Sequence, residues 1–347
     1  MSLMTEEIRQ QPAVLERTLR EGLGAAEGLR RAVEGRKPRC IVLTARGTSD
    51  NAALFGRYLL ELLTGIPVSL AAPSILTLYG GNVDYEGCLV AAISQSGEST
   101  DTNLVLNRAK EQGAITVGVT NEPESSLAAI PDHLMLVQAG RERSVAATKT
   151  YTGQVMSMYL LAWALGGKID LDDLRGIPDL AEQALTLEQE VASFADRYRF
   201  MNSTVVIGRG LNYSNAFEFA LKLMETCAVV AERFSSADFL HGPIAMLEPR
   251  FPVFGFAPGG ATWPTMRETF ETLRETTTET LLITDRSNPD VKELSRRRLV
   301  IPAAIRDETL TPIPYIIPAQ LFAAYLAEEK GLDPDNPRGL TKVTRTL

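Results

Sequence analysis

The sequence has 347 residues, of which 45% are hydrophobic and 22% are charged, and its formal net charge at pH 7 is −8. This length is enough for two domains of about 150 residues each. The acidic balance argues against a protein that binds nucleic acid or anionic membranes, because such proteins need a basic surface to displace counterions. Cys40, Cys88 and Cys227 have no paired spacing, and the two histidines, His133 and His241, are far apart, so we expect neither a disulfide framework nor a metal site.

The N-terminus, MSLMTEEIRQQP, lacks the basic and then apolar pattern of a signal peptide. No apolar run approaches the roughly 18 residues of a membrane-spanning helix. We therefore expect a cytoplasmic protein in a reducing compartment.

The first half of the chain alternates helices with strands. Residues 5–34 are amphipathic and predict one or two helices. The elements expected next are a strand running into a turn over 40–50, a helix over 51–63, a short strand after the turn at 65–67, a strand over 89–93, a helix over 101–113, strands over 114–121 and 133–140, and a long helix that ends near 165. Such alternation indicates a parallel sheet with helices on both faces.

Residues 168–200 are polar and amphipathic, which predicts a helical connector, and the strand–turn–helix pattern then starts again. With a one-residue insertion, segment 204–226 aligns with segment 41–63, so that Arg209-Gly210 falls on Arg46-Gly47. This weak internal repeat favours two copies of one α/β domain. In the second copy we expect strands over 251–258, 278–285 and 297–302 and a final helix over 318–331. The expected division is an N-terminal helical segment (1–37), a first domain (38–167), the connector (168–200), a second domain (201–331) and a C-terminal tail that contributes to the active site (332–347).

The most informative stretch runs from Leu89 to Thr100. Its apolar part, Leu89–Ile93, predicts a strand buried on both faces, and the segment after Thr100 predicts a helix. The turn between them consists of Ser94, Gln95, Ser96, Gly97, Glu98 and Ser99. Because the first turn of a helix has unsatisfied N–H groups and the positive end of the helix dipole, we expect a phosphate-binding cup here.

A second turn, ARGTSD over residues 45–50, also follows a strand and precedes a helix. Its Thr48 and Ser49 either cap the helix or contact a ligand, and the spacing leaves both interpretations open. Ligands of open parallel sheets bind beyond the carboxyl ends of the strands, where both turns lie. A dinucleotide site is disfavoured, because neither ARGTSD nor GRGLNYSN has G-x-G-x-x-G spacing.

Segment 216–230 predicts a helix that is apolar almost all round and therefore buried. It nonetheless carries Glu218, Lys222 and Glu225, which share one stripe of the helix. One interpretation is an exposed salt-bridge stripe. The other is a cleft, because buried ionised groups are costly unless they are paired. A carboxylate beside an ammonium group is suited to proton transfer.

Two further residues have both structural and chemical interpretations. His241 precedes Gly242-Pro243, a turn that would hold the ring at a loop tip, where an imidazole suits general acid–base catalysis. His133, which precedes an apolar strand, is interpreted as structural. Lys342 lies in the tail, where lysines are usually inert, and spacing alone assigns it no role.

Several motifs together resemble one family. ARGTSD, AISQSGES, SVAATK, FEFALKLMET, LHGPIA and PRGLTK occur in the order seen in the isomerase half of glucosamine-6-phosphate synthase. The chain thus resembles a tandem pair of sugar-isomerase (SIS) domains over residues 40–347. The resemblance implies an α/β fold with two three-layer α-β-α SIS domains and parallel, flavodoxin-like sheets.

The resemblance implies that hydroxyl and amide side chains of the two turns hold a sugar phosphate, and that Val145 offers its backbone to the sugar. These side chains are Thr48, Ser49, Ser94, Gln95, Ser96 and Ser99. Gly47, Arg46 and Glu218 are secondary candidates.

The resemblance also implies catalytic roles. Glu225 matches the base that moves a proton between carbons 1 and 2, and Lys222 matches its partner lysine. His241 matches the ring-opening histidine, which the neighbouring subunit contributes, so we expect a homodimer. Lys342 matches the lysine that forms an imine with the ketose. Aldose–ketose interconversion requires such groups to open the ring and to carry a proton across an enediol. We expect no cofactor and no metal.

The chain departs from the synthase pattern at several positions. The synthase begins with a glutamine-hydrolysing domain whose nucleophile is an N-terminal Cys, whereas the first cysteine here, Cys40, lies in an expected strand. Arg46 stands in place of a Cys, Ala147 in place of a Ser that contacts the sugar, and Met224 in place of a Lys. The Arg-Gly-Thr-Ser form is similar to SIS-type amino-sugar phosphate deaminases, which work with free ammonia.

We therefore expect a hexosamine-6-phosphate deaminase and aldose–ketose isomerase that converts glucosamine 6-phosphate to fructose 6-phosphate and ammonia. A synthase-like isomerase that uses ammonia or a partner glutaminase is one alternative. A sugar-phosphate sensor without catalysis is another, but the combination of Glu225, His241 and Lys342 favours an enzyme. The expected partner is a small-molecule sugar phosphate rather than a nucleic acid or a membrane.

Overall fold

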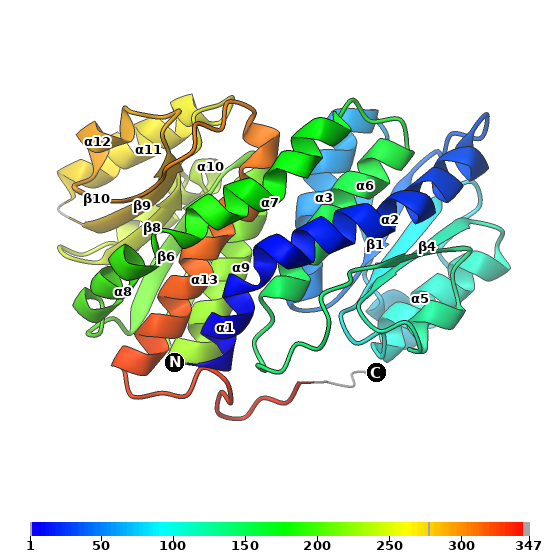
Figure 1. Ribbon diagram of the computed structural model, residues 1–347, viewed down its shortest axis with the longest axis horizontal. Coiled ribbons are helices and arrows are strands. Elements are labelled where there is room, and N and C mark those ends of the chain that lie inside the picture. Colours follow the sequence, from blue (N-terminus) through cyan, green and yellow to red (C-terminus); the bar gives the residue numbers. More distant parts are fainter. Residues whose placement is uncertain (1, 277, 343–347) are drawn as a thin grey trace. The chain divides into compact units, whose positions relative to one another are not determined.

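The computed structural model describes residues 2–276 and 278–342, and the chain divides into two compact units (Figure 1). Unit 1 consists of the N-terminal residues up to Pro12, the short segment Arg143–Thr148 and Gly176–Leu340. Unit 2 consists of Ala13–Glu142, Lys149–Arg175 and the tail from Thr341. Residues 343–347 of the expected tail lie outside the described residues.

Unit 2 contains a five-stranded, fully parallel sheet with the strand order β2-β1-β3-β4-β5. The strands are β1 (Ile41–Thr44), β2 (Val68–Leu70), β3 (Leu89–Ile93), β4 (Ile115–Thr120) and β5 (His133–Leu136). β1 is flanked by β2 on one side and by β3 on the other, so the connections leave β1 and β3 in opposite directions. At such a switch point the carboxyl ends of the two strands form a crevice.

Helices cover both faces of this sheet. They are α2 (Gln11–Val33), α3 (Thr48–Thr64), α4 (Ser74–Thr77), α5 (Thr100–Glu111) and α6 (Lys149–Ala164). On one face, Val42 and Val90 pack with Val105 of α5. On the other face α3 and α6 approach closely, because Gly56 has no side chain to displace Met158. Each fully buried aliphatic side chain of this kind contributes about 1.5–3 kcal/mol.

Unit 1 contains a second parallel sheet, with the strand order β10-β9-β8-β6-β7. Its strands are β6 (Ser203–Gly208), β7 (Val230–Ser235), β8 (Pro252–Phe256), β9 (Glu279–Asp285) and β10 (Arg297–Ile301). If the strands of each sheet are numbered from one to five along the chain, both sheets have the strand order 2-1-3-4-5. The repeat predicted from segments 41–63 and 204–226 is therefore confirmed, since β1 and β6 hold the same position.

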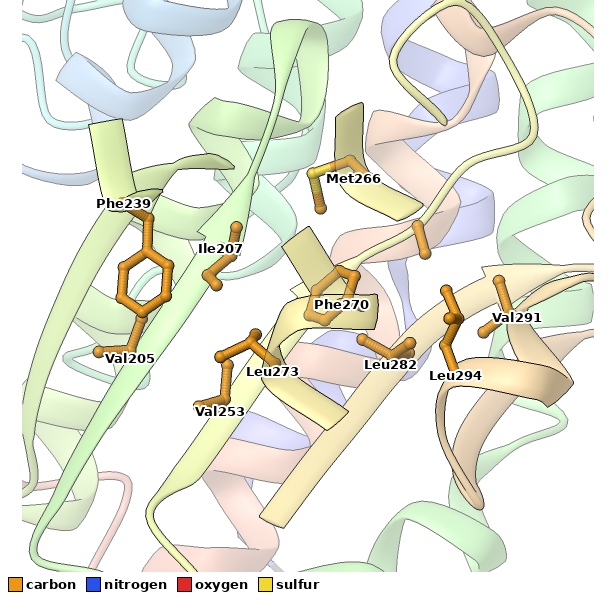
Figure 2. Packing of buried hydrophobic residues seen from close by; sticks show 11 residues of the cluster. Val205, Ile207, Phe239, Val253, Met266, Phe270, Leu273, Leu282, Val291 and Leu294 are labelled. Atoms are coloured by element: carbon orange, nitrogen blue, oxygen red, sulfur yellow. The ribbon is translucent and has the colours of Figure 1, made fainter. Parts of the chain in front are cut away.

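The helices of unit 1 and of the connector are α1 (Leu3–Arg9), α7 (Leu171–Leu185), α8 (Glu188–Arg197), α9 (Tyr213–Cys227), α10 (Ser236–Leu240), α11 (Trp263–Glu275), α12 (Val291–Leu294) and α13 (Pro312–Glu329). Figure 2 shows the hydrophobic core on one face of this sheet, where Phe270 of α11 lies among strand residues such as Val253 and Leu282. The opposite face is aromatic: the ring of Phe322 in α13 lies 5.0 Å from that of Phe254 and 5.8 Å from that of Phe219.

The expectation that the final helix begins at Pro318 is wrong, because α13 already begins at Pro312. Pro312 and Pro314 lie in its first turn, where backbone N–H groups have no intrahelical partner and proline is tolerated. Pro318 is therefore an interior residue that removes one helical hydrogen bond, in a helix that is buried almost throughout. A proline inside a helical segment is therefore not sufficient to place the first residue of the helix.

Among the helices of residues 2–276 and 278–342, none is long and apolar enough to cross a membrane. Within the same residues, no three or more His, Cys, Asp or Glu side chains are grouped so that they could hold a metal ion.

Candidate functional site

The turn between β3 and α5 presents its hydroxyl groups at a helix N-terminus. Ser99 is the N-cap of α5 in an extended conformation, and its side chain makes no capping bond to the helix. Its Oγ lies 3.3 Å from Ser94 Oγ, and Ser94 Oγ also accepts the N–H of Gly97 at 3.1 Å. Gly97 is required there, because its φ is +68° and a Cβ would lie 2.0 Å from Ser125 Oγ. The turn thus combines two hydroxyls with the positive end of α5.

The neighbouring turn between β1 and α3 contributes a second helix N-terminus. Gly47 is its N-cap with φ 57°, a conformation that glycine readily adopts. Ser49 is buried and accepts a hydrogen bond from Gln154 Nε2 at 3.0 Å, whereas Thr48 is half-buried. Arg46 donates through Nε to Asp101 of α5 at 2.7 Å, so the two turns are joined by an ion pair.

A buried carboxylate, Glu142, lies beside this region in unit 2 and was missed by the sequence analysis. Its Oε2 accepts hydrogen bonds from Gln95 Nε2 at 3.0 Å and from Lys342 Nζ at 3.2 Å. The Thr150 hydroxyl donates to the same oxygen at 2.6 Å. The tail lysine is thereby brought to the turn between β3 and α5, which spacing could not show. The only signal for Glu142 was an acidic residue a few positions before a helix.

In unit 1, the charged stripe of α9 is buried rather than exposed. Lys222 and Glu218 have no exposed side-chain surface, and Glu225 retains 23%. Lys222 Nζ lies 2.5 Å from Glu225 Oε2 and 3.5 Å from Glu218 Oε1. The exposed-stripe interpretation is therefore wrong for two of the three residues. Two carboxylates around one ammonium leave a negative charge whose accessible end is Glu225.

The two remaining candidates in unit 1 have different surroundings. His241 is exposed at the C-cap of α10, and its backbone N–H donates to Asp238 O at 3.2 Å. Val145 N–H donates to Asp335 O at 3.1 Å, so its predicted backbone contact with a sugar concerns its carbonyl oxygen. Asp335 itself caps α1 by accepting the N–H groups of Leu3 and Met4 at 2.8 and 2.7 Å.

The equivalent turn in unit 1, between β8 and α11, has a single hydroxyl residue. Residues 257–262 read Ala-Pro-Gly-Gly-Ala-Thr and correspond in number to residues 94–99. Their single hydroxyl residue, Thr262, donates its N–H to Glu308 Oε2 at 3.0 Å and its hydroxyl to the other oxygen of that carboxylate. A carboxylate at this position would repel a phosphate.

A family model for the SIS domain matches residues 36–164 and, a second time, residues 201–329. The chain belongs to the SIS domain family. Its two SIS domains coincide with the two parallel sheets, one in each unit.

The glutamine–fructose-6-phosphate aminotransferase (isomerizing) of Gloeobacter violaceus is 35% identical over 354 residues, which cover 98% of this chain but 58% of that protein. This SIS chain thus spans a little over half the length of that curated relative. Two solved structures align along nearly their whole length. They are the C-terminal domain of glucosamine-fructose-6-phosphate aminotransferase from Francisella tularensis (TM-score 0.87, 28% identity, 97% of this chain and 98% of that chain) and a candidate phosphosugar isomerase from Silicibacter pomeroyi (TM-score 0.85, 30% identity, 96% and 100%).

Proposed function

We propose that this protein binds a hexosamine 6-phosphate and converts it with water to fructose 6-phosphate and ammonia. The observation that supports this best lies within unit 2. There Gln95 of the phosphate-binding turn and Lys342 of the tail contact the same oxygen of Glu142. An anion-binding turn and an amine nucleophile at one place suit a phosphorylated sugar that reacts through an imine.

Each step of the proposal uses a group of this chain. Ser94 and Ser99 bind the phosphate, whose binding energy positions the distant reacting carbons. His241, from the neighbouring subunit of a homodimer, opens the sugar ring. Glu225 removes the proton from carbon 2 and returns it to carbon 1, which converts the amino-aldose to a ketose imine. Lys342 displaces ammonia from carbon 2 by forming its own imine, and water then releases the ketose.

The proposal is tested by incubating the protein with glucosamine 6-phosphate and measuring ammonia and fructose 6-phosphate. We expect both products in equal amounts, and no turnover of unphosphorylated glucosamine. Tight binding without turnover would instead identify a sensor. Neither binding nor turnover with any hexosamine 6-phosphate would remove the proposal.

The similarity to aminotransferases favours a second candidate, the same chemistry run from fructose 6-phosphate towards the amino sugar. Ammonia would then be supplied free or by a glutaminase. This direction is tested by incubating fructose 6-phosphate with ammonium salts and measuring glucosamine 6-phosphate. The rates of synthesis and of deamination, compared at equal substrate concentration, show which direction the protein favours.

A further inference from the structure

We propose that Glu142 is a positioning residue that holds Lys342 at the phosphate-binding turn, an inference that rests on the proposed function of Lys342. All the groups involved belong to unit 2. The Lys342 ammonium lies 3.2 Å from Glu142 Oε2, and 26% of its side chain is exposed. The Glu142 side chain has no exposed surface. The described end of the tail is therefore held by a buried carboxylate, in addition to the contacts that Asp335 makes.

Glu142 is itself held by the start of α6. Thr150, in the first turn of that helix, donates its backbone N–H to Glu142 Oε1 at 3.2 Å and its hydroxyl to Oε2 at 2.6 Å. The positive end of the helix dipole stabilises a carboxylate at this point. With Gln95 and Lys342 added, Oε2 faces three donors, whereas Oε1 accepts the Thr150 N–H.

The contact with Gln95 connects this position to the phosphate-binding turn. A carboxylate only accepts hydrogen bonds, so the Gln95 amide must turn its NH₂ group towards Glu142. One hydrogen of that group binds Glu142, and the other remains for a phosphate oxygen. Glu142 therefore orients two side chains: Gln95, which we expect to bind the phosphate, and Lys342, which we expect to form the imine.

The decisive variant is Glu142→Gln, which keeps the shape and removes the charge. Its matched control is Asp132→Asn, since Asp132 also receives a threonine N–H, a threonine hydroxyl and a lysine ammonium, from Thr116 and Lys110. Asp132 precedes β5 at the amino end of the sheet, away from both turns. The Asp132 side chain is 44% exposed, so this control removes a hydrogen-bonded carboxylate that pairs with a lysine but leaves both turns untouched. A general effect of removing such a carboxylate would appear in both variants.

The first measurement traps the imine. The Lys342 amine adds to carbon 2 of fructose 6-phosphate, water leaves, and borohydride reduces the carbon–nitrogen double bond to a stable secondary amine that mass spectrometry locates. We expect labelling of Lys342 to slow about tenfold in Glu142→Gln, as fits the loss of one charge-assisted hydrogen bond, while KM changes less. Wild-type labelling rates in Glu142→Gln would overturn the proposal.

The second measurement does not depend on the reaction. Trypsin cleavage after Arg338 reports how firmly the tail is held, and we expect it to accelerate in both Glu142→Gln and Lys342→Gln but not in Asp132→Asn. The Lys342→Gln variant, at a partly exposed position, keeps the test valid if Glu142→Gln fails to fold. If borohydride does not label Lys342 in the wild-type protein but trypsin cleaves the variants faster, the imine chemistry is rejected. The positioning role of Glu142 is then retained. Unchanged cleavage in both would reject the positioning role.

Discussion

At the scale of single residues, α9 shows how a buried lysine, Lys222, holds a partly exposed carboxylate, Glu225. Lys222 is enclosed between Glu218 and Glu225, and an ammonium without these partners would cost several kcal/mol in this position. Of the three residues, Glu225 alone has exposed side-chain surface. The cluster therefore favours Glu225 as the proton-transferring group and Lys222 as the charge that holds it.

We predict that Glu225→Gln keeps the affinity for glucosamine 6-phosphate but slows proton exchange at carbon 2 by about a hundredfold or more, because an amide cannot take up the proton. Proton NMR in deuterated water measures the exchange. Glu271→Gln is the control, since Glu271 also pairs with a cation on its own helix, Arg267, but on the surface of α11. Exchange at the wild-type rate would exclude Glu225 as the base.

At the scale of elements, Glu188 connects three helices of unit 1. It lies in the first turn of α8 and accepts hydrogen bonds from Arg9 of α1, at 3.0 Å to Nε, and from the Tyr325 hydroxyl of α13. Burial by itself raises the pKa of Glu188, but the bonds from Arg9 and Tyr325 outweigh burial and hold the pKa below its ordinary 4.5. Burial, together with the hydrogen bond to Glu188, raises the pKa of Tyr325 to about 12, so it remains a donor.

A carboxyl group whose pKa is lower in the folded than in the unfolded protein stabilises the fold at pH values above its unfolded pKa. This stabilisation is lost as the pH falls through the folded pKa. We therefore predict that Glu188→Gln lowers the free energy of unfolding by about 1 kcal/mol at pH 7, and by progressively less below pH 4.5. Urea denaturation across this pH range measures the difference. Glu190→Gln in the same helix should not destabilise at pH 7, because burial raises the pKa of Glu190 and its charge opposes folding. A loss that is equal at pH 3 and pH 7 would contradict the role of the charge.

At the scale of the whole molecule, two copies of one fold have come to differ at the same turn. Residues 94–99 keep hydroxyl and amide side chains, whereas residues 257–262 have mostly Ala, Pro and Gly and receive the Glu308 carboxylate. The buried charged cluster shows the opposite distribution, since it lies on α9 of unit 1. The polar turn after β3 thus lies in one copy and the buried charged cluster in the other.

The two N-cap positions test this difference. We predict that Ser99→Ala weakens binding of inorganic phosphate and glucosamine 6-phosphate about tenfold, since a hydrogen bond to a charged ligand is lost. Thr262→Val, at the equivalent position, should leave both affinities within about twofold, because that hydroxyl already binds Glu308. Isothermal titration calorimetry measures both. A larger loss in Thr262→Val would place the phosphate in the other domain.

Much of this arrangement is local and was predictable. The strand, polar turn and helix start from Leu89 to Thr100 were predictable because they are consecutive in the chain, and phosphate binding by this turn stays a prediction. For Lys222 the sequence left an exposed stripe and a cleft open, and the structure shows the side chain buried. Glu142 could not be found in this way, since its partners Gln95 and Lys342 are 47 and 200 residues away along the chain.

The sequence by itself determined the duplicated α/β fold, the turn after β3 and the family, because these depend on hydrophobic periodicity and on contiguous motifs. Only the tertiary structure decided which of the charged residues on α9 are buried, that Glu142 joins Lys342 to the turn after β3, and that Glu308 occupies the equivalent turn of the second copy. Burial and pairing depend on segments far apart in the chain, and no local pattern records which of them meet.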